Sequence, residues 1–514
     1  MIRLALLIII LAAAQQAGSE EAIALTKIEQ DLAKLRVELE NPKIFNRKTC
    51  ATYIENHTLS LFEDGANRYL PDTEEDQTKL LNSAPRIARS LFEFRIGLLE
   101  ISRKFDKTND LNQSCRNSIF RALRYSRFIE EMLMEWYFNK TGSAAATEVL
   151  AGQEPSLMVL GNENTYTPHS GDILVVRSRF FVSATIARIS DEEGQFSHSA
   201  LIHIDDNNQV WVLESLIEKG VIAVPWREWV RHEPVRVLVL RHHDGNTAKQ
   251  VANWLFNFIE WRKKNGLEPV PYDFNMNFQD SRELSCSELV RFAFAEATDG
   301  RIGIPKYPSS VNKLSNKKLF KDLGIKELEI FSPSDYEADP SLTLIAEWKD
   351  YSRTYGTRIQ DAILTSVFSW MTQMNYELTY KGFTQGMGES YWRFLRPMGL
   401  GQQMVPTNMT RGFFNIILAL NSVTGALENA MRRVENQNRW NKGWGLDYKT
   451  MLVNLEEIRK NDCKEYLSRR NGMNENYFLG EPDLSKKELL FHQFLNIPSE
   501  AGDCQENQIN NPES

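Results

Sequence analysis

Several features that define other classes of protein are missing from this 514-residue sequence. Basic residues are not in excess: 68 Asp and Glu outnumber 60 Lys and Arg, and the formal net charge of −8 argues against nucleic acid as a partner. Histidine and cysteine are scarce, at eight and five residues, and none of them follows the spacing of a zinc site. We therefore expect neither a metal ion nor a cofactor.

The sequence also lacks a long hydrophobic run. The run from Leu4 to Ala14, after Arg3, is too short to span a bilayer and ends in three alanines before Gln15. This pattern is typical of a secretory signal peptide, residues 1–14, so we expect an exported protein in the periplasm or outside the cell. No cysteine follows the run, so a lipoprotein anchor is not indicated. The apolar stretch from Phe413 to Val423 is also too short for a transmembrane span, and we expect a buried helix there.

Five cysteines in an exported protein leave one without a partner. Cys50 and Cys115 flank helical segments near the N-terminus, Cys463 and Cys504 lie together near the C-terminus, and Cys286 stands alone in the middle. The simplest partition is a disulfide within each of the two outer pairs and a free thiol at Cys286. The four outer cysteines allow three pairings, and the sequence cannot choose among them.

The length of the chain exceeds what one hydrophobic core usually serves, so two or three domains are expected. Helical periodicity predicts an N-terminal helical region over residues 20–150 and a C-terminal one over 332–500, where Leu342 to Met374 is expected to be a long helix. A polar tail follows at 501–514. The flanks carry no visible chemistry, but they offer surfaces for protein partners. The middle of the chain, residues 165–325, differs from both.

In this middle segment the helical period gives way to short runs rich in β-branched residues. The runs are Ile173 to Val176, Ser199 to Ile204, Val210 to Leu213, Val221 to Val224 and Val235 to Leu240. Five such strands predict a small antiparallel sheet. Helices are expected at Thr247 to Lys264 and from Cys286 onward, so the segment is predicted to be an α+β domain.

Cys286 lies where a polar loop gives way to an apolar-periodic helix. The free N–H groups and the positive end of the dipole at a helix N-terminus stabilise a thiolate, which is the nucleophilic form of cysteine. A cysteine at this position is therefore a candidate nucleophile, although a lone cysteine in an apolar helix is more often inert packing.

A histidine and a carboxylate upstream complete the set that a thiol hydrolase needs. His198 opens one predicted strand, and Glu214 ends the next. Successive side chains of a strand point to opposite faces, which places His198 on the face opposite His203. His203 precedes two aspartates and is expected to be solvated. Glu218 competes with Glu214, but it lies in a loop. The pair His242-His243 ends a strand, and we interpret it as a surface feature.

The order of these motifs resembles that of the circularly permuted NlpC-type papain-like amidases, the YiiX-like cysteine hydrolases. In ordinary papain-like enzymes the cysteine helix comes first, whereas here it comes last. The resemblance covers roughly residues 167–312 and rests on motifs in a fixed order. They are Gly171-Asp172-Ile173-Leu174, Phe196-Ser197-His198, Val212-Leu213-Glu214, Pro271-Tyr272-Asp273 and Ser285-Cys286-Ser287-Glu288.

The resemblance implies a role for each residue. Cys286 would be the nucleophile, His198 its general base and later acid, and Glu214 the group that orients the imidazole. Tyr272 would donate to the oxyanion beside the backbone N–H of Cys286, and Gln279 is a weaker candidate for the same task. Tyr272 could equally be a packed residue in a turn.

These roles predict an exported cysteine hydrolase that cleaves an amide or an ester through an acyl-enzyme. Export and the NlpC-type relationship favour peptidoglycan peptides as substrate. Relatives of the permuted group favour an alternative, a lipid or acyl-amide hydrolase or acyltransferase, and Phe180-Phe181-Val182 could line its apolar pocket. A third hypothesis is a non-enzymatic envelope binding or scaffolding protein, but the presence of Cys, His and Glu together argues against it.

Overall fold

The fold is taken from a computed structural model of the chain. It describes residues 26–41, 43–63, 68–70, 73–107, 111–142, 150–151, 167–232, 234–313, 319–320, 323, 325–378, 408–471 and 491–496. The predicted signal peptide, the polar tail and Cys504 lie outside these ranges. No helix within them is both long enough and apolar enough to cross a membrane.

The N-terminal region is helical, as predicted. Its elements are α2 (Lys27–Glu40), α3 (Cys50–Tyr53), η1 (Ile54–Leu59), α4 (Ser60–Glu63), α6 (Glu74–Lys107) and α7 (Gln113–Thr141). The start of α7 is defined by Asn112, whose side chain accepts a hydrogen bond from the backbone N–H of Cys115. Gly142, in the left-handed conformation at φ 60°, ends it.

The predicted disulfide between Cys50 and Cys115 is present and joins α3 to α7. Cys463 is also disulfide-bonded, but its expected partner, Cys504, is not among the described residues, so that pairing stays a prediction. Cys286 is free, as expected.

The centre of the molecule is an antiparallel sheet whose strand order is β1-β9-β6-β2-β3-β4-β5. The strands are β1 (Leu150–Ala151), β2 (Ile173–Arg177), β3 (His198–Ile204), β4 (Val210–Leu216), β5 (Gly220–Pro225), β6 (Arg236–His242) and β9 (Leu342–Lys349). Five of them, β2 to β6, are the strands predicted from the sequence. The order follows the chain from β2 to β5, whereas β6 returns to pair with β2 on its other side.

β9 was not predicted, because we expected a helix from Leu342 onward. The strand has six buried residues in succession, including Glu347 and Lys349, so it shows no alternation of apolar and polar residues. Its charged side chains are buried because they form ion pairs, which a sequence pattern does not reveal. Pairing of β9 with β6 extends the sheet beyond residue 325, where we had expected the central domain to end.

Both faces of the sheet are covered. On one face, Leu201 and Leu213 pack with Leu289 of α11 and residues of α10, and on the other Ala200, Ile202 and Val212 pack with Trp229. The elements around the sheet are α8 (Phe181–Ala187), α9 (Trp226–Trp229), η3 (Val230–His232), α10 (Gly245–Lys264), α11 (Cys286–Ala297), β7 (Ser309–Ser310), β8 (Glu329–Ile330) and η4 (Pro333–Tyr336).

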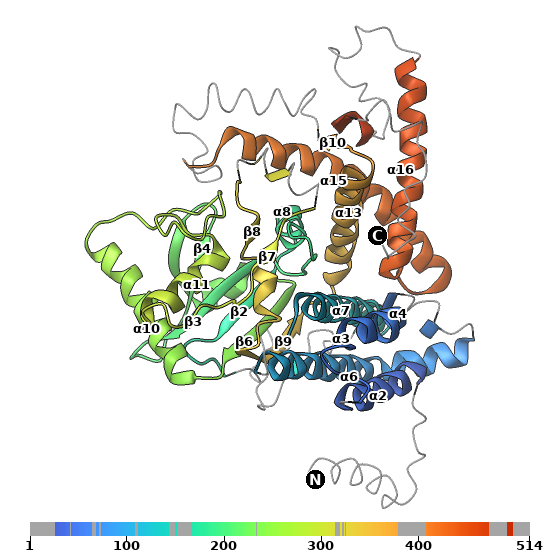
Figure 1. Cartoon of the computed structure of the whole chain (residues 1–514). Coiled ribbons are helices and arrows are strands. Elements are labelled where there is room, and N and C mark those ends of the chain that lie inside the picture. Colours follow the sequence, from blue (N-terminus) through green and yellow to red (C-terminus); the bar gives the residue numbers. More distant parts are fainter. Residues whose placement is uncertain are drawn as a thin grey trace, which may run out of the picture.

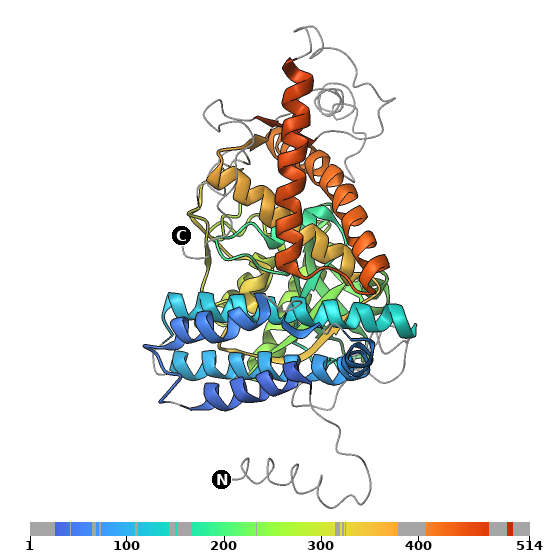
Figure 2. The ribbon, with the colours of Figure 1, turned by 90° about the vertical axis from the view of Figure 1, so that its right-hand side faces the viewer.

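The C-terminal region packs on the sheet domain and on the N-terminal helices (Figure 1). Its elements are α13 (Thr354–Gln373), β10 (Glu377–Leu378), α15 (Arg411–Lys442), α16 (Tyr448–Asn471), η8 (Phe491–Phe494) and β11 (Leu495–Asn496). Figure 2 shows the N-terminal helices, in blue, stacked at the bottom of the molecule with the C-terminal helices above them. The α15 helix contains the apolar stretch 413–423, so the predicted helix is confirmed, but only one face of it is buried, with Ile416, Ala419, Leu420 and Val423.

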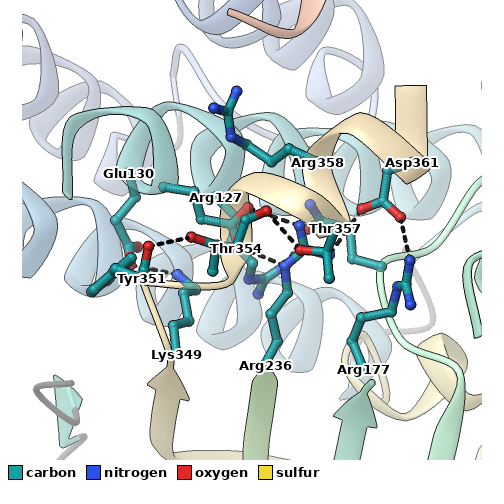
Figure 3. A network of polar contacts seen from close by, with 12 residues as sticks. Arg127, Glu130, Arg177, Arg236, Lys349, Tyr351, Thr354, Thr357, Arg358 and Asp361 are labelled. Carbon is teal, nitrogen blue, oxygen red and sulfur yellow. Dashed lines mark hydrogen bonds and ion pairs between the residues drawn. The ribbon is translucent and has the colours of Figure 1, made fainter. Parts of the chain in front are cut away.

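A network of buried charges joins these parts (Figure 3). Glu347 of β9 accepts hydrogen bonds from Arg95 of α6 at 3.1 Å and from Arg127 of α7 at 2.6 Å. Lys349 lies 3.0 Å from the same carboxylate and also pairs with Glu130. Burial opposes ionisation of Glu347, but the three cations hold its pKa well below the usual range.

The network continues into the C-terminal region through α13. Arg236 of β6 donates to Glu131 of α7 at 2.6 Å and to Asp361 of α13 at 2.9 Å. Arg358, one turn earlier on α13, pairs with Glu135 of α7 at 2.6 Å. All five side chains are at most 2% exposed. Helices from both flanks are thus fixed to the central sheet by hydrogen-bonded ion pairs.

The network predicts a large loss of stability in Glu347→Ala. The substitution leaves Arg95 and Arg127 buried without their shared carboxylate, which costs about 3–5 kcal/mol. The free energy of unfolding, from urea titration followed by circular dichroism, measures the loss. Glu93→Ala is the control, since Glu93 pairs with Arg36 and Arg89 at the surface of α6 and its loss should change stability little. Equal effects of the two substitutions would contradict this account.

Candidate active site

Cys286 is the first residue of α11, as the sequence predicted. Ser285 caps the helix: its side chain accepts from the N–H of Glu288, and Glu288 Oε2 accepts from the N–H of Ser285 at 2.8 Å. The Ser199 hydroxyl of β3 donates to the carbonyl oxygen of Cys286 at 3.0 Å. The cysteine is therefore held against the start of β3, and its side chain is only 3% exposed.

His198 and Glu214 lie together beside Cys286. The register of β3 and β4 pairs Ala200 with Glu214, so His198, two residues before Ala200, lies on the same face as the carboxylate. His198 Nε2 is 2.7 Å from Glu214 Oε2, and the indole N–H of Trp229 donates to the same oxygen at 3.2 Å. Glu214 is 1% exposed, whereas the His198 side chain is 21% exposed. The carboxylate is thus buried, and the imidazole reaches the surface.

The imidazole is hydrogen-bonded to the thiol as well as to Glu214. Burial alone lowers the pKa of His198, but the hydrogen bonds and the negative charges of Cys286 and Glu214 raise it to about 10. Because Nε2 is bonded to Glu214, Nδ1 is the nitrogen that is left for Cys286. An imidazolium in this position stabilises a neighbouring thiolate.

Tyr272 lies on a loop that β5 holds in place. The N–H of Val221 donates to the carbonyl oxygen of Val270 at 2.9 Å. Gly220, at φ 69°, allows this approach, since a Cβ there would lie 2.1 Å from the same oxygen. Tyr272 is 8% exposed and its hydroxyl is hydrogen-bonded to Cys286. Burial first, and then the negative charge of Cys286, raise its pKa well above the usual value, so the hydroxyl stays protonated and can donate.

The structure separates the other candidates from the thiol. Gln279 is exposed in the loop, and Cys286 is not among its described contacts. Glu218 is exposed, as expected. His203 is on the opposite face from His198, but it is buried rather than solvated, because its ring stacks on Phe256 of α10 at 4.2 Å.

The interpretation of His242-His243 as a surface pair was half wrong. His243 is exposed, whereas His242 is buried and packs against Phe294 of α11. The end of β6 is covered by α11, which the local sequence does not indicate. Within the described ranges, no group of three or more His, Cys, Asp or Glu could hold a metal ion.

Three features of the site were not predicted. Trp229 donates to Glu214, and Tyr336 of η4 donates to the carbonyl oxygen of Ser287 in the first turn of α11 at 2.5 Å. Asp273 and Glu288 share a hydrogen bond, and burial together with the charge of Asp273 raises the pKa of Glu288 to about 7. Near neutral pH this carboxyl pair therefore carries less than two full negative charges, which limits its repulsion of a thiolate at Cys286.

Two hollows adjoin the Tyr272 loop. One, of about 320 Å³, is polar and is lined mainly by loop residues such as Asn275, Asn277 and Glu283. The other is an apolar slot between α8, α15 and Tyr272. Asp273 lines both.

Comparison with protein families agrees with this geometry. Residues 167–346 match the family model described as permuted papain-like amidase enzyme, YaeF/YiiX, C92 family. The matched segment contains strands β2 to β6, α11 and most of β9, so it covers the sheet and the cysteine helix. No curated protein matches the chain. Residues 167–346 of this chain are therefore similar to the permuted papain-like amidases, a family of cysteine peptidases.

Proposed function

We propose that the protein is a cysteine amidase in which Cys286 is the nucleophile, His198 the general base and acid, and Glu214 the orienting carboxylate. The observation that carries this proposal is the position of His198, whose Nε2 is hydrogen-bonded to Glu214 and whose ring interacts with the Cys286 thiol. Glu214 fixes the ring and balances the charge of the imidazolium. Trp229, bonded to the same oxygen, fixes the carboxylate.

In the proposed reaction the thiolate attacks the carbonyl carbon of the substrate. The tetrahedral oxyanion receives hydrogen bonds from the backbone N–H of Cys286, which has no acceptor within its own helix, and from the Tyr272 hydroxyl. The bond to the leaving group breaks as His198 donates its proton to that group, which leaves a thioester on Cys286. His198 then removes a proton from water, and the hydroxide releases the acid and restores the thiolate.

For the substrate, we propose an amide of cell-envelope peptides. The predicted signal peptide and the NlpC-type relationship support this choice, and so does the polar hollow with Asn275 and Asn277 beside Tyr272. A second candidate, an acyl amide or lipid ester, is favoured by the apolar slot on the other side of Asp273. Both candidates use the same acyl-enzyme chemistry.

The proposed mechanism predicts the effects of four substitutions. Cys286→Ala and Cys286→Ser should lower kcat/KM roughly 10,000-fold or more, and His198→Ala should be comparably severe. Glu214→Gln should be milder, since it misorients the imidazole but leaves the base in place. His203→Ala is the matched control and should keep its activity. The measurement is hydrolysis of peptide amides by purified protein, and activity retained in Cys286→Ala would refute the thiol mechanism.

The proposed ion pair predicts a bell-shaped pH dependence. Because the pKa of His198 is raised to about 10, the imidazolium persists through neutral pH and is lost only as the pH rises through that value. Activity should rise from acid pH as the thiolate forms and fall at high pH. At neutral pH, iodoacetamide should label Cys286 faster in the wild type than in His198→Ala, which lacks the imidazolium. Equal labelling rates in the two proteins would show that His198 does not activate the cysteine.

The proposed export is tested at the N-terminus. When the whole chain is expressed with a secretion pathway present, mass spectrometry should find a mature protein that begins at Gln15, outside the cytosol. Deletion of residues 2–14 should leave the protein in the cytosol. A cytosolic protein that retains Leu4 to Ala14 would contradict the proposal.

A further inference from the structure

The carbonyl oxygen of Tyr272 is held by a residue of the C-terminal flank. The side-chain amide of Asn408, 136 positions further along the chain, donates to this oxygen at 2.7 Å and to Glu283 Oε1 at 3.3 Å. Within the described ranges, no backbone N–H donates to the Tyr272 carbonyl. Asn408 also lies beyond residue 346, where the family match ends. The matched segment therefore does not contain the partner of its own Tyr272 carbonyl.

The two hydrogen bonds of Asn408 join both sides of the loop that forms the site. An asparagine amide has two N–H donors, so one group serves both acceptors. Tyr272 lies on the first side of the loop, and Glu283 lies on the second, three residues before the nucleophile. The backbone pairs the same two sides, since the N–H of Leu284 donates to the carbonyl oxygen of Pro271 at 2.9 Å. The amide thus ties the segment that carries the phenol to the segment that leads to the thiol.

The flank also packs against the apolar side of this loop. Tyr272, Phe274 and Met409 are buried together in one small cluster. The ring of Phe274 lies 5.2 Å from that of Tyr272 and 5.0 Å from that of Phe413 on α15. The same short stretch of the flank therefore supplies both the hydrogen bonds and the apolar contacts that hold the loop.

The position of Asn408 is set by the start of α15. Thr410 caps this helix, because its side chain accepts from the N–H of Phe413 at 3.1 Å. Further along α15, Leu420 and Val423 are buried in a core that α15 shares with α13 (Figure 1). The buried ion pairs described above join α13 to the central sheet. A continuous series of packed elements thus leads from the sheet to Asn408.

We propose that Asn408 is a positioning residue of the active site, and that the C-terminal flank completes the oxyanion hole by holding the Tyr272 loop beside Cys286. The proposal rests on the proposed function, in which the Tyr272 hydroxyl donates to the oxyanion. Such a donor acts only at hydrogen-bond distance from the developing charge, and a displacement of about 1 Å can lower the rate roughly 100-fold. The thiol and the imidazole are held by α11, β3 and β4 and do not depend on Asn408.

Two reagents that react with the same thiol separate the oxyanion hole from the nucleophile. With 4-nitrophenyl acetate, the thiolate attacks the carbonyl carbon, a tetrahedral oxyanion forms, and 4-nitrophenolate leaves an acetyl thioester on Cys286. With iodoacetamide, the thiolate displaces iodide directly and no oxyanion forms. The ratio of the two second-order rates therefore reports the oxyanion hole alone, whichever substrate the enzyme has in the cell.

Tyr272→Phe removes the hydroxyl but keeps the ring, and it should lower the ratio of ester to alkylation rates roughly 100-fold. Asn408→Ala and the equal-sized Asn408→Asp, which lacks the N–H donors, should each lower the ratio about 10-fold or more and leave alkylation unchanged. In the Tyr272→Phe background the Asn408 substitutions should add little, because no hydroxyl is left to misplace. Asn421→Ala, at an exposed position of α15, is the matched control and should keep the wild-type ratio.

The possible outcomes distinguish this proposal from the mechanism on which it rests. A wild-type ratio in both Asn408 variants, with a lowered ratio in Tyr272→Phe, would overturn the role of Asn408 and leave the cysteine mechanism standing. An unchanged ratio in Tyr272→Phe would remove Tyr272 as the oxyanion donor, and the role of Asn408 with it. Equal loss of both rates in variants that thermal unfolding shows to be folded would also overturn the proposal. Ester cleavage that persists in Cys286→Ala would overturn the proposed function itself.

Discussion

The pairing of buried charges around the central sheet is the interaction on which the arrangement of the molecule depends. Glu347 is shared by an arginine from each of two N-terminal helices, and Asp361 joins α13 to the sheet through Arg236. Buried ion pairs add little net stability compared with apolar packing, but leaving one member unpaired is costly. We infer that the network acts mainly by excluding other arrangements of the flanks. It fixes α13, and it thereby restricts where the C-terminal helices can lie beside the papain-like domain.

Local sequence patterns predicted the strands and helices in which buried residues recur at a regular spacing along the chain. Strands β2 to β6, the start of α11 at Cys286 and the Cys50–Cys115 disulfide were all foreseen. β9 was not, because its buried Glu347 and Lys349 are satisfied by residues more than two hundred positions away. The burial of His242 and His203 under helices, and the contact of Tyr336 with α11, likewise arise from tertiary packing. The apolar slot belongs to this class, since its walls come from α8 and α15.

The candidate site shows why the order of the motifs along the chain does not constrain the chemistry. The thiol, the imidazole and the carboxylate come from α11, β3 and β4, and they meet because β3 pairs with β4 and receives the first turn of α11. Whichever segment is made first, the same three contacts form. Glu288, which caps the helix that positions Cys286, is itself an acid. Its hydrogen bond with Asp273 and its raised pKa reduce the negative charge beside the thiol.

The Cys50–Cys115 disulfide has a consequence for the lifetime of the thiol. A compartment that is oxidising enough to form this disulfide also oxidises exposed thiolates. Cys286, however, is only 3% exposed, and the other described cysteines are already in disulfides. A sulfenic acid formed on Cys286 would find no resolving cysteine among them with which to condense. A recessed thiol also resists mixed disulfides with other proteins, which need an accessible sulfur. Small peroxides would then reach this thiol more readily than the disulfides of other proteins.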